Sequence, residues 1–206
     1  MKALKGWDNI VLILKIYGLA ILFFFVFRLM LFFTGIGNID DVSDSYADIV
    51  KAFIMGIRFD IVISGYLLVF PYLALTILFL LNKRSLIISR IVFYFVFILF
   101  SFSFLICAID IPYFNQFFSR FTISAFQWLD SPVFVFRMVI EEPRYWVYTI
   151  PFFLLTILFY MVLRIIFRKS GELPVVRRLL MLKIVVSVIF LGFMFTGIRG
   201  RLAQKA

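Results

Sequence analysis

The chain has 206 residues, of which 65% are hydrophobic and only 16% are charged. Soluble domains average about 25% charged and roughly 45–50% apolar residues, so this composition excludes an ordinary soluble globular domain. The formal net charge of +10 does not indicate a nucleic-acid partner, because the basic residues gather in short links between apolar segments. Those segments have about the 20-residue length that crosses a bilayer, which predicts a polytopic membrane protein.

The apolar segments predict an all-α membrane protein with five transmembrane helices. In chain order the crossings are residues 10–33, 59–81, 91–109, 146–167 and 179–196. The first is too long and too charged for a cleaved signal peptide, so we expect it to remain in the mature protein. Residues 1–198 are predicted to form one membrane domain, and residues 199–206 to begin a linker.

The distribution of charge predicts the orientation of these crossings. The links after the second and fourth crossings carry Lys83, Arg84, Arg90, Arg164, Arg168, Lys169, Arg177, Arg178 and Lys183. By the positive-inside rule these links are cytoplasmic. Acidic residues occupy the links expected on the other face, namely Asp40, Asp41, Asp44, Asp48, Glu141 and Glu142. The N-terminus is therefore predicted inside and the C-terminus outside.

The two outer links carry the predicted interfacial helices. Tyr46, Ile49, Val50, Phe53, Ile54 and Ile57 recur at helical spacing, which indicates an amphipathic helix at the outer interface leading into the second crossing. The second link, residues 111–145, is rich in Phe and Trp but is broken by polar residues and by Pro132 and Pro143. Short helices embedded at the outer surface fit this pattern.

Several unlike charges share one depth near the outer ends of the crossings. We expect Arg28, inside the first crossing, to pair with Asp60 or Asp110, because a lone Arg inside a membrane is expensive. Ser64, one turn after Asp60, is predicted to share its hydrogen bonds. Two interpretations stay open for the outer charges: ion pairs and interfacial anchors, or a polar pocket for an anionic lipid headgroup. The candidate residues are Arg28, Arg58, Asp60, Asp110, Arg120, Arg137 and Arg144.

The chain lacks the residues of the common catalytic sites. It contains no histidine, one cysteine (Cys107), and no Gly-rich phosphate loop or zinc motif. No catalytic, cofactor-binding or metal-ligating residue is therefore assigned, and no cofactor is expected in this chain. Membrane lipids, including anionic phospholipid headgroups, are the predicted partners.

The stretch "GIRFDIVISGYLLVFPYLAL", residues 56–75, resembles the second crossing of the lipoteichoic acid synthase and phosphoglycerol transferase family. That family belongs to the alkaline phosphatase/sulfatase superfamily. Its "G-x-RFD" pattern corresponds here to Gly56, Arg58, Phe59 and Asp60, followed by Tyr66, Leu67, Leu68 and Pro71. "AIDIPYF", residues 108–114, resembles the family's acidic-then-aromatic exit from the third crossing, and the closing "GIRGRLAQKA" resembles the linker to its catalytic domain.

The resemblance implies a membrane anchor and lipid-presenting domain of a sulfatase-like phosphoglycerol or phosphoethanolamine-type transferase. It also implies the cytoplasmic membrane of a bacterium and, beyond Ala206, an extracytoplasmic domain that binds a divalent metal and carries the activity. On this reading the chain is a fragment or a truncated product without activity of its own. The alternative is a stand-alone polytopic protein that binds a partner or transports a lipid or small solute. An open reading frame beyond codon 206 favours the first reading, and a stop codon the second.

Overall fold

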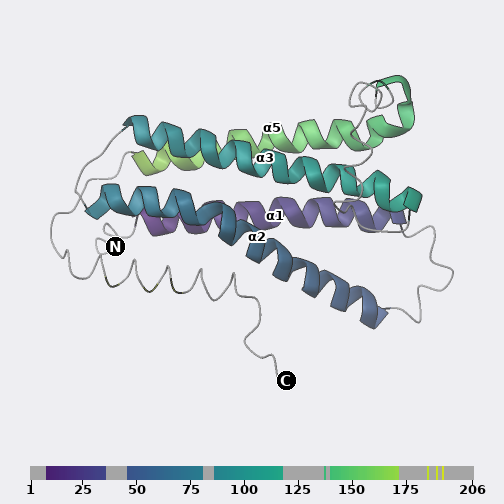
Figure 1. The fold of residues 1–206 in the computed structure, drawn as a ribbon, viewed down its shortest axis with the longest axis horizontal. Helices are drawn as coiled ribbons and strands as arrows, with labels where there is room; N and C mark the ends of the chain where they lie inside the picture. The colour runs from purple at the N-terminus through teal and green to yellow at the C-terminus, as the bar shows by residue number, and fades with distance from the viewer. Residues whose placement is uncertain are drawn as a thin grey trace.

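The computed structural model describes residues 8–35, 46–80, 86–117 and 140–171, together with Arg137 and the isolated residues Val185, Ile189 and Gly192. The long elements of this part of the chain are four helices: α1 (Asp8–Gly35), α2 (Tyr46–Leu80), α3 (Leu86–Phe117) and α5 (Pro143–Gly171). Figure 1 shows them side by side in a bundle, with successive helices running in opposite directions.

All four helices are long and apolar enough to span a membrane. They contain 28 to 35 residues each, which at about 1.5 Å per residue exceeds the roughly 30 Å hydrocarbon core of a bilayer. Leu22, Phe70, Ile98 and Leu154 point outward and are more than half exposed. Such an apolar exterior suits a lipid solvent, and the chain is an all-helical protein built to cross a membrane several times.

The first four predicted crossings lie within α1, α2, α3 and α5, apart from one residue at the end of the second. The predicted fifth crossing, residues 179–196, lies outside the described residues except for Val185, Ile189 and Gly192, which are helical. The first predicted interfacial helix is not a separate element. In the second outer link Arg137, Ile140 and Glu141 are helical, and Glu142 interrupts the helix before α5 begins at Pro143. Residues 46–58 join the second crossing in α2, and residues 111–117 extend α3.

The helix that contains the third predicted crossing extends beyond Ile109, where the predicted crossing ends. Apolarity ends near Asp110, but the hydrogen-bonded helix continues through Pro112 to Phe117.

Helix α2 changes direction along its length (Figure 1). Its C-terminal half lies along the bundle, whereas its N-terminal half diverges from the other helices. Pro71 lies inside the helix and is buried. Proline has no N–H to donate, and its ring clashes with the carbonyl one turn earlier, so it is the physical cause we assign to the bend.

The interior of the bundle is held by rings from three helices. Phe159 of α5 lies 5.3 Å from Phe23 of α1 and 5.6 and 5.1 Å from Phe100 and Phe104 of α3, measured between ring centroids. Phe24 of α1 is 5.3 Å from Phe104 as well. These spacings are typical of favourable aromatic pairs. The cluster fixes α1 against α3 and α5, and so sets the position of Arg28 one turn after Phe24.

Candidate functional site

An ion pair joins α1 to α2 inside the predicted membrane spans. Arg28 Nη2 donates a hydrogen bond to Asp60 Oδ1 at 2.8 Å. The side chains are only 17% and 8% exposed, respectively. The pairing predicted for Arg28 is therefore present with Asp60. Each charge stabilises the other in a setting where an unpaired charge would cost several kcal/mol or more.

The backbone of α2 completes the surroundings of Arg28. Arg28 Nη1 donates a second, longer hydrogen bond to the Phe53 carbonyl oxygen, at 3.5 Å. The Phe53 ring packs edge-on against Phe25 and Phe32, which lie on either side of Arg28 in α1. Between Phe53 and Asp60 lies Gly56, whose missing side chain leaves room for the guanidinium. Arg28 is thus held by three successive turns of α2.

This geometry divides the "G-x-RFD" stretch into two faces. Gly56 and Asp60, four residues apart, both face Arg28. Arg58 and Phe59 are exposed, and Phe59 is 61% exposed. One pair of residues therefore fixes α1 to α2, while the other is presented to the surroundings. Of these two arginines, Arg58 is exposed, whereas the Arg28 side chain is only 17% exposed.

Ser64 does not share the hydrogen bonds of Asp60, contrary to the sequence-based expectation. Its Oγ and the second carboxylate oxygen of Asp60, Oδ2, are both buried, and within the described part of the chain neither has a hydrogen-bond partner. Spacing alone places Ser64 one turn from Asp60, but it does not fix the direction in which the hydroxyl turns.

Tyr17 adds a contact that the sequence did not predict. Its hydroxyl donates to the Ile61 carbonyl oxygen at 2.5 Å, next to Asp60 in the chain. Together with Arg28, it gives α1 two side chains that donate to main-chain carbonyls of α2. A tyrosine inside an apolar helix was a weak signal of this role, because a buried hydroxyl usually finds an acceptor.

The other candidate residues lie apart from this pair in the chain or outside the described side chains. Asp110, near the end of α3, is half-buried and takes part in an interaction of its own. Arg137 is exposed, and its Nε lies 3.8 Å from Glu141 Oε1. The Arg120 position and the Arg144 side chain are not among those described. A further link between α3 and α5 joins Asn115 Nδ2 to the Tyr148 hydroxyl at 3.2 Å.

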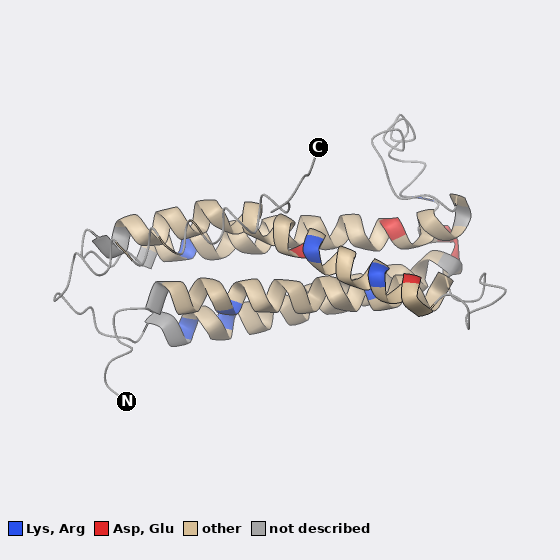
Figure 2. Cartoon of the chain, turned by 90° about the horizontal axis from the view of Figure 1, so that it is seen from below, with Lys and Arg blue, Asp and Glu red and all other residues tan. Residues whose placement is uncertain are grey.

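The described charges separate along the bundle. The coloured residues in Figure 2 are basic at the end where α1 begins, whereas acidic residues gather toward the opposite half, among further basic ones. Asp8, the first residue of α1, is an acidic residue at the mainly basic end. The basic set includes Lys15, Arg90, Arg164 and Arg168, and the acidic set comprises Asp48, Asp60, Asp110, Glu141 and Glu142. Among the described residues no group of three or more carboxylate or thiol side chains lies close enough to hold a metal ion.

Comparison with known proteins adds no relative: no family model, no curated protein and no solved structure matches the chain. The candidate site consists of the ion pair between Arg28 and Asp60, the exposed Arg58, and the buried oxygens Asp60 Oδ2 and Ser64 Oγ.

Proposed function

We propose that the chain is a membrane anchor that presents an anionic lipid to a transferase-type catalytic domain on the outer face of a bacterial cytoplasmic membrane. The observation that carries the proposal is the exposed Arg58 on α2, two residues before an Asp60 that Arg28 already neutralises. Asp60 is bound to Arg28 within the bundle, whereas the Arg58 side chain is exposed on another face of α2. A guanidinium suits a phosphate because its planar fork donates two parallel hydrogen bonds.

The separation of charge supports the orientation that this proposal needs. The mainly basic end of the bundle fits the cytoplasmic side. In this proposed orientation Arg58 lies in the outer half. Reporter fusions at residues 85, 130, 172 and 206 test the orientation. We expect cytoplasmic signals at the first and third positions and external signals at the second and fourth. A cytoplasmic signal at residue 206 would remove the lipid-presenting role and favour a stand-alone polytopic protein.

Lipid binding is tested with the full chain in nanodiscs that contain equal amounts of phosphatidylglycerol and phosphatidylcholine. Native mass spectrometry then counts the lipid of each kind that the protein retains. We expect Arg58→Ala to lower the preference for phosphatidylglycerol about tenfold, as the loss of one charge-assisted hydrogen bond of roughly 1.4 kcal/mol would. Arg58→Lys keeps the charge but loses the planar fork. Its preference for phosphatidylglycerol should lie between those of the wild type and Arg58→Ala.

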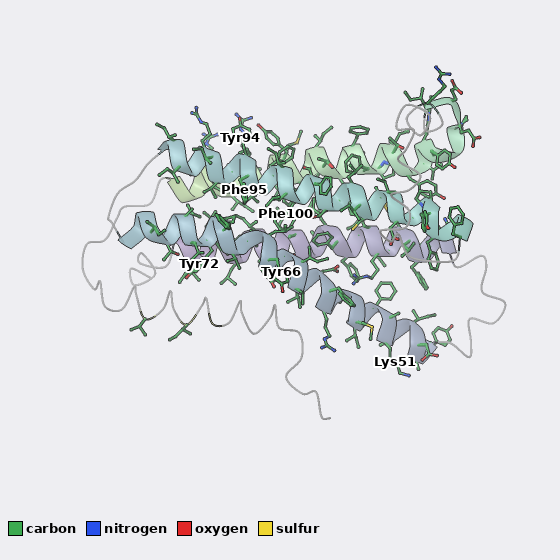
Figure 3. The ribbon with its side chains drawn as sticks, viewed as in Figure 1. Lys51, Tyr66, Tyr72, Tyr94, Phe95 and Phe100 are labelled. Carbon is green, nitrogen blue, oxygen red and sulfur yellow. The ribbon has the colours of Figure 1, made fainter. Side chains whose placement is uncertain are left out.

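Lys51 offers a matched control for Arg58. It is an exposed basic residue on the same helix, seven positions earlier and so on nearly the same face. Figure 3 shows it in the diverging part of α2, pointing away from the other helices. Lys51→Ala should leave the lipid preference unchanged. An equal loss with Lys51→Ala, or no loss with Arg58→Ala, would contradict a specific role for Arg58.

A further inference from the structure

The two buried oxygens beside the ion pair lie on one face of α2. Asp60 and Ser64 are four residues apart, so they face the same way about 6 Å apart along the helix axis. That face packs on α1, as shown by the bonds from Arg28 to Asp60 and from Tyr17 to the Ile61 carbonyl. Asp60 is 6% exposed and Ser64 is fully buried. Both oxygens therefore lie in the interface between the two helices.

Among the described helical hydroxyls, those of Ser64, Ser101 and Thr156 are buried without a partner, and only Ser64 lies one turn from another such oxygen on the same helix. Thr34, Ser103 and Thr149 each donate to the carbonyl one turn earlier, at 3.0 Å. Ser64 makes no such bond, and Asp60 Oδ2 accepts none from the described residues. Buried polar atoms without a partner are destabilising, and in native proteins nearly all of them are satisfied by protein groups or by ordered water.

Charge and size limit what satisfies these oxygens. Arg28 already neutralises Asp60, so a bound cation would leave a net positive charge buried between apolar helices. A neutral hydrogen-bond donor leaves the net charge of the Arg28–Asp60 pair at zero. Ser64 has no exposed surface, so a group bound beside it must be small and must enter as α1 and α2 separate slightly. A hydroxyl is such a group, since it donates to one oxygen and accepts from the other.

We infer that Asp60 Oδ2 and Ser64 Oγ form a binding site for a neutral hydroxyl between α1 and α2. Water and the alcohol hydroxyl of a lipid headgroup are the two sources with this chemistry. The hydroxyl donates to Asp60 Oδ2 and accepts from Ser64 Oγ, and so extends the polar contact of Arg28 by one turn into the bundle. The site does not use Arg58, so it stands or falls separately from the proposed lipid binding.

A double-mutant cycle of Asp60→Asn and Ser64→Ala tests the site. The ratio of folded to unfolded protein is measured by chemical unfolding of the full chain. Each single substitution lowers this ratio by some factor. If one hydroxyl bridges both residues, the factor for the double variant should be about fivefold smaller than the product of the two single factors, which is within the range measured for coupled neighbours. If Asp60→Asn prevents insertion, Asp60→Glu replaces it, because it keeps the charge but displaces the oxygen.

Ser101 provides the matched control, because its Oγ is also buried without a partner among the described residues but lies on α3. The cycle of Asp60→Asn with Ser101→Ala should be additive. Equal coupling in this control, or additivity in the Ser64 cycle under every lipid condition, overturns the inference.

The lipid conditions distinguish the two sources. The Ser64 cycle is run in lipid-free detergent, in phosphatidylethanol, which is anionic but has no headgroup hydroxyl, and in phosphatidylglycerol, which has two. Coupling in phosphatidylglycerol alone assigns a headgroup hydroxyl. Coupling in all three assigns water, provided that radiolytic labelling in ¹⁸O-water finds a slowly exchanging water beside the peptide that carries Asp60 and Ser64. Coupling in all three without that water means direct contact between Asp60 and Ser64, and overturns the inference.

Discussion

Gly56 of α2 leaves the space that the guanidinium of Arg28 of α1 occupies. A Cβ at position 56 would come closer than 3.0 Å to Cζ, Nη1 and Nε of Arg28. The guanidinium cannot move aside freely, because it bonds to Asp60 and to the Phe53 carbonyl. The absence of one side chain therefore allows a charge in α1 to reach a charge in α2.

We predict that Gly56→Ala destabilises the bundle. The added methyl group forces the Arg28 guanidinium away, and the hydrogen bonds to Asp60 and Phe53 lengthen or break, at a cost of about 1–3 kcal/mol. Unfolding in detergent micelles measures the change. Gly18→Ala is the control, because a Cβ at that position has no atom within 4 Å. A Gly56→Ala protein as stable as the wild type would show that the close approach has no energetic importance.

Removing only one charge of the Arg28–Asp60 pair should lower the free energy of unfolding more than removing both charges. We expect Arg28→Ala to lower the free energy of unfolding by about 3–5 kcal/mol, because it leaves a buried carboxylate without its partner. The double variant Arg28→Met with Asp60→Leu should recover most of that loss. Lys51→Ala, which breaks the exposed pair with Asp48, should cost less than about 1 kcal/mol. Equal losses in the single and double variants would contradict this account.

The sequence predicted the membrane class and the four described helices, because these follow from long apolar runs. The cost of a lone charge predicted a partner for Arg28 and left Asp60 and Asp110 as the two candidates, of which the structure shows Asp60. The sequence did not predict that α2 is continuous from Tyr46, because polar residues in its first turns resembled an interfacial link. The role of Gly56 was equally hidden. Its position one turn before Asp60 was a usable signal, since a small residue there lets a neighbouring helix approach closely.

The direction of the Ser64 hydroxyl could not be predicted at all. It depends on a side-chain torsion that the neighbouring helix determines, and spacing along α2 gives only the face on which Ser64 lies. The predicted lipid contact at Arg58 and the outward C-terminus rest on charge patterns and stay predictions.

The hydrogen bond from Tyr17 to the Ile61 carbonyl should make a smaller contribution than the ion pair. Tyr17→Phe removes the donor and leaves the carbonyl with its bond inside the helix. We expect a loss of roughly 0.5–1.5 kcal/mol, near the values measured for hydrogen bonds between membrane helices. Tyr66→Phe is the control, because Tyr66 is 63% exposed. A loss above about 3 kcal/mol would mean that Tyr17 acts through more than this one bond.

Phe159 should be the most sensitive aromatic position in the interior. It is fully buried and meets rings of α1 and α3 at 5.1 to 5.6 Å. Phe159→Ala removes these contacts and leaves a cavity. Soluble cores lose about 3–5 kcal/mol on such a change.

In a membrane, lipid surrounds the ring when the helices separate, and lipid is as apolar as the ring itself. Phe159→Ala therefore loses only the packing contacts, and we expect the free energy of unfolding to fall by about 3 kcal/mol or less. Phe153, on the same helix, provides the control, because its side chain is 59% exposed. Phe153→Ala should change the free energy of unfolding little. If the two variants proved equally stable, burial of rings between α1, α3 and α5 would not hold this bundle together, and the position of Arg28 would need another cause.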